Sequence, residues 1–347
     1  MLFLKCSSLC EAKSIKNELE AKNILIKGIP PLKDGASIKF PISQRIENYE
    51  IEEIHESNTI SEFRKVNGVS EKHRESSLQF EHYGDTILIG REGDVEYYRE
   101  LCQKYSSKYI LLKKRISREC IRDPETKLLY SADSGLGNEP IAFCRQNGIY
   151  YSWYPLHSMF CRGNIGEKLR MAALACQGET LLDLYAGIGY WVFPLIKAGC
   201  SQVFACDMNP WSIKALKNNI EANRCDKSNV DGGVPSVVVL EGDNAVHVDT
   251  YKDRCDRVVL GLLPSSQSGW HLAIRALRLD GGTLHIHENL AKSDVLGFSE
   301  FLKVKLVEYW SEYKATECQI SISTVTVVKS YAPRVYHYVF DVKISKQ

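Results

Sequence analysis

The sequence of 347 residues lacks any long hydrophobic run. One of its longest apolar stretches, Val258 to Pro264, falls far short of the roughly 20 residues that a helix needs to cross a bilayer. The apolar start, Met1 to Lys5, is too short for the core of a signal peptide and runs into charged sequence. We therefore expect a cytoplasmic protein with neither a membrane helix nor a secretion signal.

Regular cysteine spacing is also missing. The 12 cysteines are scattered from Cys6 to Cys318, and no two of them form a Cys-x-x-Cys pair. Zinc sites and disulfide frameworks both depend on such spacing, so we expect neither, and no other metal site. Small buried thiols in a reducing compartment are the remaining interpretation.

The chain has almost no net charge, with 44 basic against 43 acidic residues. The charge is nevertheless uneven, because one basic strip, residues 104–122, holds seven bases and the single acid Glu119: Lys104, Lys108, Lys113, Lys114, Arg115, Arg118 and Arg122. Two tyrosines, Tyr105 and Tyr109, interleave with them. Such a strip either follows the phosphate backbone of a nucleic acid or is a solvated surface, and both interpretations stay open.

Composition divides the chain into three parts. Residues 1–76, with a charged helical segment at Glu11 to Ala21 and a Glu-rich stretch without clear periodicity, are an accessory region. Residues 77–154 predict a small α+β domain, with strands at 86–89, 109–112 and 148–151 and a helix at 95–105. The basic strip makes this second part a candidate for contact with nucleic acid.

Residues 155–347 alternate strand and helix patterns at spacings near 25 residues, which is typical of a parallel sheet covered by helices. We expect strands at 180–184, 202–206, 237–241, 257–262 and 282–287. Two further β-rich runs, at 320–328 and 334–344, predict a closing antiparallel hairpin at the edge of the sheet.

A glycine turn follows the first of these strands. Asp183 ends the strand, and Gly187 and Gly189 precede a helix, so the backbone can adopt positive φ angles and approach a ligand at the helix N-terminus. Alone, this turn is also explained as a structural link between strand and helix. Asp207, at the end of the next strand, is placed to accept hydrogen bonds from a ribose diol, and the two features together predict a nucleoside site.

Further residues distinguish between a dinucleotide and S-adenosylmethionine as the ligand. A dinucleotide fingerprint has a third glycine where this chain has Val192, and the bulky Tyr190 and Trp191 would crowd a pyrophosphate. S-adenosylmethionine has no pyrophosphate, and Asp243 with Asn244, after the third strand, matches the pair that meets adenine in methyltransferases. We therefore predict a class I S-adenosylmethionine-dependent methyltransferase-like α/β fold with S-adenosylmethionine as its ligand.

Two flanking segments bear on the reaction. Asn164 followed by Glu167 predicts a capping box, and Lys168 in the same first turns is a candidate to hold the carboxylate of the ligand. After the fourth strand, enzymes that methylate amines or ring nitrogens often carry Asn/Asp-Pro-Pro-aromatic. Here residues 260–266 read Leu-Gly-Leu-Leu-Pro-Ser-Ser, without an acceptor side chain, which argues against ordinary N-methylation.

Two histidines, His285 and His287, alternate on the fifth strand and therefore share a face. Satisfied core histidines are the default interpretation, and a proton-handling role is the alternative.

Six segments taken together resemble the tRNA wybutosine-synthesizing protein 2 family: Phe160–Lys168, Asp183–Tyr190, Gly242–Asn244, Leu260–Ser266, His285–Asn289 and Val328–Pro333. The Leu-Gly-Leu-Leu-Pro-Ser-Ser and Lys-Ser-Tyr-Ala-Pro elements are far more specific than the glycine turn. The resemblance covers the chain from about Asp85 to its end.

This resemblance implies transfer of the 3-amino-3-carboxypropyl group of S-adenosylmethionine to C7 of 4-demethylwyosine, at position 37 of phenylalanine tRNA. It implies ligand-binding roles for Cys161, Lys168, Asp207, Asp243 and Asn244 and a substrate loop that contains Leu260, Gly261, Pro264 and Ser265. Cys161 stands where the family generally has serine, and Asp207 where it often has glutamate. No residue is assigned as a general base, and we expect a monomer.

Two alternatives stay open. A related tRNA guanine-37 N1-methyltransferase would share the fold and the middle segment, but it should carry Asn-Pro-Pro after the fourth strand. A catalytically silent tRNA-binding protein would keep the fold and carry a damaged ligand site.

Overall fold

The computed structural model describes residues 2–6, 32–34, 37–42, 51–53, 80–114, 117, 121–132, 139–224 and 235–347. The chain forms two compact units, Met1–Ser77 and Leu78–Gln347. The predicted helix Glu11–Ala21 lies outside the described residues. Within the described part, no helix combines the length and the apolar character needed to cross a membrane.

The first unit contains a four-stranded antiparallel sheet that the sequence analysis did not predict. Its order is β2 (Leu32–Asp34), β3 (Ser37–Ile42), β1 (Leu2–Cys6) and β4 (Ile51–Glu53). These strands have three to six residues, which is too short for an alternating pattern to stand out from the charged sequence around them.

The second unit begins with a sheet of four strands: β5 (Phe80–Tyr83), β6 (Thr86–Ile89), β7 (Tyr109–Leu112) and β8 (Lys127–Ser131). The α3 helix (Val95–Tyr105) connects β6 to β7, which run parallel, as a crossover helix allows. The predicted strands at 86–89 and 109–112 and the predicted helix at 95–105 are confirmed.

A β-hairpin follows, formed by β9 (Ala142–Gln146) and β10 (Ile149–Trp153). Its two-residue turn is Asn147 and Gly148, with φ angles of 55° and 81°. An Asn-Gly pair with positive φ at both positions fits the right-handed twist of the flanking strands. The sequence analysis predicted β10 and missed β9.

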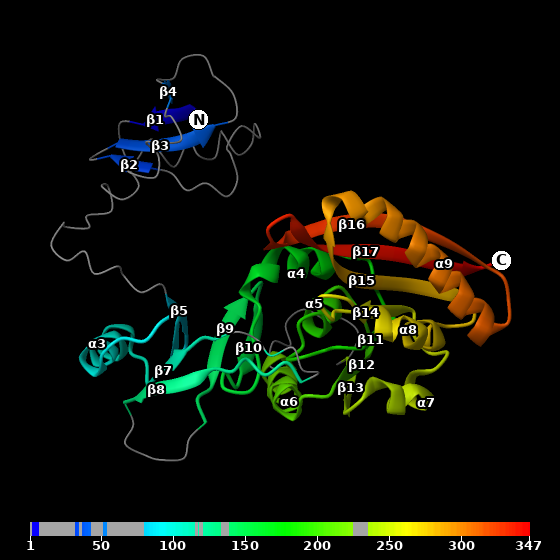
Figure 1. Cartoon of the computed structure of the whole chain (residues 1–347), viewed down its shortest axis with the longest axis horizontal. Helices are drawn as coiled ribbons and strands as arrows, with labels where there is room; N and C mark the ends of the chain where they lie inside the picture. The colour runs from blue at the N-terminus through cyan, green and yellow to red at the C-terminus, as the bar shows by residue number, and fades with distance from the viewer. Residues whose placement is uncertain are drawn as a thin grey trace. The chain divides into compact units, whose positions relative to one another are not determined.

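A seven-stranded sheet dominates the second unit (Figure 1). Its order is β13-β12-β11-β14-β15-β17-β16, in which the first five strands run parallel and the last two close the sheet as an antiparallel hairpin. The predicted fold class is confirmed. The strands are β11 (Thr180–Asp183), β12 (Gln202–Asp207), β13 (Ser236–Glu241), β14 (Arg257–Leu260), β15 (Gly281–Ala291), β16 (Cys318–Ala332) and β17 (Val335–Lys346).

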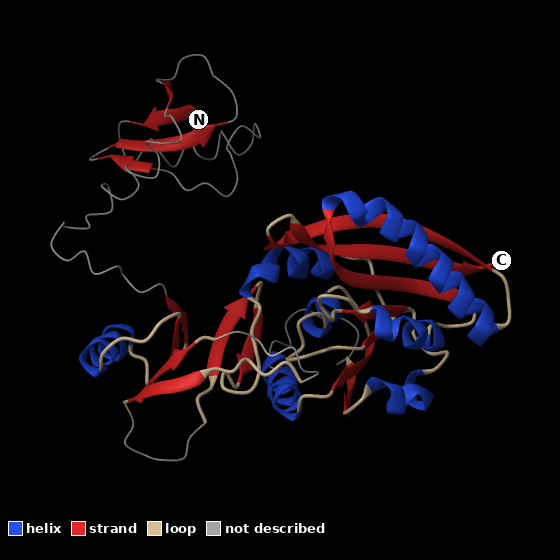
Figure 2. Cartoon of the chain, in the orientation of Figure 1, coloured by secondary structure: helices blue, strands red, loops and turns tan. Residues whose placement is uncertain are grey.

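Helices cover both faces of this sheet, and the long α9 helix runs along β15, β17 and β16 (Figure 2). Alternate strand residues point to opposite faces, so Leu182 joins the core under α8 and α9, whereas Leu181 joins the core under α4, α5 and α6. The helices are α4 (Ile165–Ala172), α5 (Val192–Lys197), α6 (Pro210–Arg224), α7 (Val248–Tyr251), α8 (Trp270–Ala276) and α9 (Val295–Lys314), with 3₁₀ turns η1 (Arg162–Asn164), η3 (Asn244–His247), η4 (Gln267–Gly269) and η5 (Lys292–Asp294).

The buried side chain of Asn219, on α6, joins the hairpin to the glycine turn. Its Oδ1 accepts from the Ser152 backbone N–H at 2.7 Å, and its Nδ2 donates to the carbonyls of Ser152 at 3.0 Å and Ile188 at 3.1 Å. Ile188 lies between the two glycines of the turn. One side chain therefore satisfies backbone groups of two separate segments.

We predict that Asn219→Leu lowers the free energy of unfolding by about 3 kcal/mol, because it leaves buried N–H and C=O groups without partners. Urea denaturation measures the change. The neighbouring Asn218→Leu, at an exposed position of the same helix, is the matched control and should cost less than about 0.5 kcal/mol. Equal losses in the two variants would contradict this role.

Candidate functional site

A cavity of about 620 Å³ lies where the carboxyl ends of β11, β12, β13 and β14 meet. Segments far apart in the sequence converge here because parallel strands all end at the same edge of the sheet. Eight of the predicted site residues line this cavity: Cys161, Gly187, Asp207, Asp243, Asn244, Gly261, Pro264 and Ser265. The other four do not line it: Lys168, Asp183, Gly189 and Leu260.

The two glycines of the turn have different structural roles. Gly187 has a φ of 55°, and its N–H points to Asp207 and donates to Oδ2 at 2.7 Å. Gly189 has a φ of 99°, and a Cβ there would lie 2.2 Å from the ring of Phe193. Gly187 therefore shapes the cavity wall, whereas Gly189 permits close packing behind it.

Asp207 ends β12 and is held by backbone groups on both sides. Besides Gly187, the Asn209 N–H donates to its Oδ1 at 2.9 Å. Burial raises the pKa of Asp207, while these two N–H groups act in the opposite direction. Asn209 in turn caps α6 by accepting from the Trp211 N–H at 2.9 Å.

Asp243 and Asn244, shortly after the neighbouring strand β13, also line the cavity. The exposed Asp243 accepts from the Ala245 N–H at 2.9 Å and so caps η3. The Asn244 side chain donates to the Leu184 carbonyl at 3.1 Å, which ties this segment to the end of β11. Asp207 and Asp243 thus present carboxylates from neighbouring strands to one cavity.

The predicted capping box at α4 is wrong. Asn164 makes no capping hydrogen bond, and Glu167 instead accepts from the Arg170 guanidinium at 2.7 and 2.9 Å. Asn164 is 7% exposed and lines the cavity, and its Oδ1 is a buried acceptor that has no partner among the described residues. In the sequence, a capping role was enough to explain Asn164, so the sequence did not indicate that its Oδ1 is a buried acceptor in the cavity wall.

Lys168 lies behind the cavity wall rather than in it. Its Nζ donates to Gln146 Oε1 at 3.0 Å and lies over the rings of Tyr151, Phe160 and Tyr190, at 4.2, 4.7 and 5.2 Å from the centroids. Burial lowers the pKa of Lys168 to about 8. Its suggested contact with the ligand carboxylate stays a prediction.

Two of the six segments that carry the family resemblance touch each other at Cys161. Lys329, from the Lys-Ser-Tyr-Ala-Pro segment in β16, donates to Cys161 Sγ at 2.9 Å. A Cβ at Gly163 would lie 3.2 Å from the Lys329 side chain. The C-terminal hairpin therefore positions the segment before α4. This contact explains why the two segments occur together in a chain that has this cavity.

The loop after β14 is shaped by an aromatic side chain. A Cβ at Gly261 would lie 2.7 Å from Nε1 of Trp191, so the indole ring occupies the space of any larger residue there. Trp191 also packs against His287, with ring centroids 4.7 Å apart. The sequence has no acceptor side chain at position 261 because the Trp191 ring fills the space that such a side chain would need.

The two strand histidines differ in their surroundings. His285 Nε2 lies 2.6 Å from the Arg257 guanidinium, which can only donate, so His285 is neutral and its Nδ1–H donates to Asp341 at 2.6 Å. This is the satisfied core histidine that we expected. His287 lines the cavity and pairs with His337 at 2.9 Å, and burial lowers the pKa of both, that of His337 to about 4.

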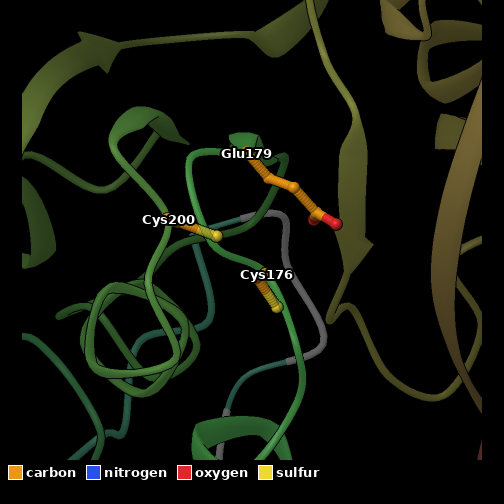
Figure 3. Close-up of side chains that lie close together, drawn as sticks. All are labelled: Cys176, Glu179 and Cys200. Atoms are coloured by element: carbon orange, nitrogen blue, oxygen red, sulfur yellow. The ribbon is translucent and has the colours of Figure 1, made fainter.

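One group of side chains has metal-ligand chemistry. Ligand atoms of Cys176, Glu179 and Cys200 all lie within 4.8 Å of one another (Figure 3). Both Glu179 oxygens, however, already accept from Arg257, at 2.6 and 3.0 Å. The group also lies at the amino ends of β11 and β12, away from the cavity. It is an ion pair beside two buried thiols, and the absence of a metal stays a prediction.

Asp183 lies under the glycine turn and is fully buried. Its Oδ1 accepts from the Tyr185 N–H at 3.2 Å, whereas Oδ2 is buried and has no partner within the part of the chain that the structure describes. Burial raises the pKa of Asp183 to about 8, so the folded protein carries this side chain as a neutral acid at pH 7.

We predict a pH-dependent stability difference between Asp183→Asn and the wild type. Above about pH 4 the unfolded wild-type chain loses the Asp183 proton that the folded chain keeps, so its stability falls as the pH rises toward 8. Asparagine does not titrate. As the pH rises, the free energy of unfolding of the variant should therefore increase relative to that of the wild type, by up to about 1.4 kcal/mol per pH unit. Urea denaturation between pH 5 and 8 measures this, and a constant difference would contradict it.

The strand order, the antiparallel C-terminal hairpin and the cavity at the carboxyl ends define an S-adenosylmethionine-dependent methyltransferase-like α/β domain. A family model described as the TRM5/TYW2 methyltransferase domain matches residues 142–316. The tRNA wybutosine-synthesizing protein 2 homolog of Danio rerio is 32% identical over 305 residues, which cover 75% of this chain and 70% of that protein. The chain therefore belongs to the TRM5/TYW2 family.

Other relatives extend this comparison. The tRNA wybutosine-synthesizing protein 2/3/4 of Arabidopsis thaliana is 39% identical over 230 residues, which are 66% of this chain and only 21% of that protein. The chain thus matches about a fifth of that plant relative. In fold, TYW2 of M. jannaschii in complex with AdoMet is similar, with a TM-score of 0.57 and 24% identity over 78% of this chain and 100% of that one.

Proposed function

We propose that this chain transfers the 3-amino-3-carboxypropyl group of S-adenosylmethionine to C7 of 4-demethylwyosine at position 37 of phenylalanine tRNA, acting as a cytoplasmic monomer without a metal. The observation that carries the proposal is the cavity, in which residues from five of the six family-like segments surround one space. The family and its wybutosine-synthesizing relatives support the choice of substrate.

The cavity fits the donor substrate in chemical terms. Asp207 offers carboxylate oxygens to the ribose diol, and Asp243 with Asn244 lines the side assigned to adenine. Among the described residues, none donates to the buried Asn164 Oδ1 in the cavity wall, and the ammonium group of the donor's amino acid would supply this hydrogen bond. S-adenosylmethionine contributes a sulfonium with three carbons that are open to displacement.

Orientation selects which of these carbons reacts. Holding the amino-acid end at Asn164 directs the methionine Cγ, rather than the methyl group, toward the incoming base. An N-methylase would present an acceptor side chain to the target amine at position 261. Gly261, which lies against Trp191, presents none. The arrangement therefore favours carbon–carbon bond formation over N-methylation.

Arg122, the last residue of the basic strip, lines the cavity beside Ile121. Two other bases of the strip are engaged within the protein, because Lys108 pairs with Asp85 and Lys113 with Glu81. Arg115 and Arg118 lie outside the described residues. We therefore assign the contact with the tRNA backbone to Arg122 first.

The decisive experiment compares two labels. The protein is incubated with tRNA that bears 4-demethylwyosine and with S-adenosylmethionine labelled either in its carboxyl group or in its methyl group. We expect the carboxyl label to enter the tRNA and the methyl label to stay in solution. Methyl label in the tRNA would identify a guanine-37 N1-methyltransferase-like activity, and no label in a chain that binds both substrates would identify a silent binding protein.

We further predict that Asn164→Ala weakens S-adenosylmethionine binding about tenfold or more, because it removes an acceptor for a charged donor. The same variant should bind 5′-methylthioadenosine as the wild type does, since that molecule lacks the amino-acid end. Calorimetric titration with both molecules measures the two affinities. Equal losses for both would show a general distortion of the cavity and would contradict this role.

A further inference from the structure

Glu288, on β15, is a buried carboxyl group with no cationic partner in the part of the chain that the structure describes. It is 4% exposed, and its Oε2 accepts from the Ser265 hydroxyl at 3.1 Å. The Ser266 backbone N–H is its second donor. The buried carboxylates of Glu167 and Asp341, by contrast, both pair with Arg170. Burying a carboxyl group without such a cation is costly, so its presence calls for a reason.

Ser265 connects this carboxyl group to the cavity. It lines the cavity and is half-buried, whereas Glu288 lies behind it and does not line the cavity. Its hydroxyl donates to Glu288 and accepts from the Gln267 N–H at 3.2 Å. A serine oxygen has two lone pairs, so one remains for a group in the cavity.

The segment that carries Ser265 is fixed to β15 by backbone hydrogen bonds. Asn289 N–H donates to the Pro264 carbonyl at 2.9 Å, and Ser265 forms an antiparallel bridge with Glu288. The hydroxyl and the carboxyl group are therefore held together by the loop and the strand, independently of their own side-chain hydrogen bond. Such preorganised pairs are suited to proton transfer.

We propose that Ser265 and Glu288 form the relay that removes the C7 proton of the base, an inference that rests on the proposed function. The C7 electron pair forms the bond to the methionine Cγ while the carbon–sulfur bond breaks, and 5′-methylthioadenosine leaves with that bond's electron pair. The cationic ring then gives its C7 proton to Ser265 Oγ as the serine proton passes to Glu288 Oε2. The electron pair of the C7–H bond returns to the ring.

The protonation behaviour of Glu288 suits this step. Burial raises the pKa of Glu288 to about 7, against the opposing effect of its hydrogen bonds from Ser265 and Ser266. A carboxyl group with this pKa accepts a proton at neutral pH and releases it again after product formation. The nearby His287 and His337 are weaker bases, because burial lowers the pKa of both.

The test uses single-turnover transfer of the carboxyl label to tRNA whose 4-demethylwyosine carries hydrogen or deuterium at C7. In the wild type we expect no primary isotope effect, because proton loss follows bond formation rapidly. Glu288→Gln keeps an acceptor for the Ser266 N–H but cannot take a proton, and Ser265→Ala interrupts the relay. Each should slow transfer about 100-fold or more and make proton loss limiting, so that a primary isotope effect appears.

Matched controls come from α9, where Ser299 is half-buried and Glu300 is exposed. Ser299→Ala and Glu300→Gln repeat the two chemical changes away from the cavity, and both should transfer at the wild-type rate. Calorimetric S-adenosylmethionine affinity, unchanged in Ser265→Ala, separates a proton-transfer defect from a distorted cavity. If Glu288→Gln fails to fold, Ser265→Ala still decides the question.

Two results would overturn the relay alone: variants that transfer within about twofold of the wild type, or slowed variants without an isotope effect. A wild-type chain that fails to transfer the carboxyl label at all would overturn the proposed function, and the relay with it. The two failures are thus distinguishable, because the first needs an active wild-type protein and the second an inactive one.

Discussion

The carboxylate of Asp207 is the constraint on which the rest of the site depends. It accepts from Gly187 at the glycine turn and from Asn209 at the start of α6, so one side chain orders two backbone segments that are 20 and 2 residues away. Both donors are backbone N–H groups, which the turn would otherwise leave without partners. Because α6 also carries Asn219, the same helix then holds the other side of the turn and the β9–β10 hairpin.

The cavity results from the topology of the seven-stranded sheet, which the hydrogen bonds of Asp207 help to maintain. Strands β11 to β14 deliver their carboxyl ends to one edge, and the segments that follow them close around one space. The C-terminal hairpin adds Lys329 against Cys161, so the last strands of the chain also shape the wall before α4. The reactive region therefore draws on residues separated by more than 160 positions, as this pair shows.

Buried ionisable groups divide into two kinds in this domain. Those of the Glu179, Arg257, His285 and Asp341 network are paired along the sheet, because each group in this series hydrogen-bonds to the next. The carboxyl group of Glu288, near the cavity, has no cationic partner among the described residues and accepts hydrogen bonds from Ser265 and Ser266. The first kind stabilises the fold, and the second kind is available to a substrate.

The sequence by itself determined the alternation of strands and helices, the glycine turn with Asp207 and the closing hairpin. These features arise from local periodicity and backbone chemistry, which a sequence carries directly. Only the tertiary structure decided that Asn164 has a buried acceptor that no described residue pairs with, that Lys168 lies behind the cavity wall and that Ser265 contacts Glu288. Each of these depends on which distant segment a side chain meets, and local patterns do not encode such contacts.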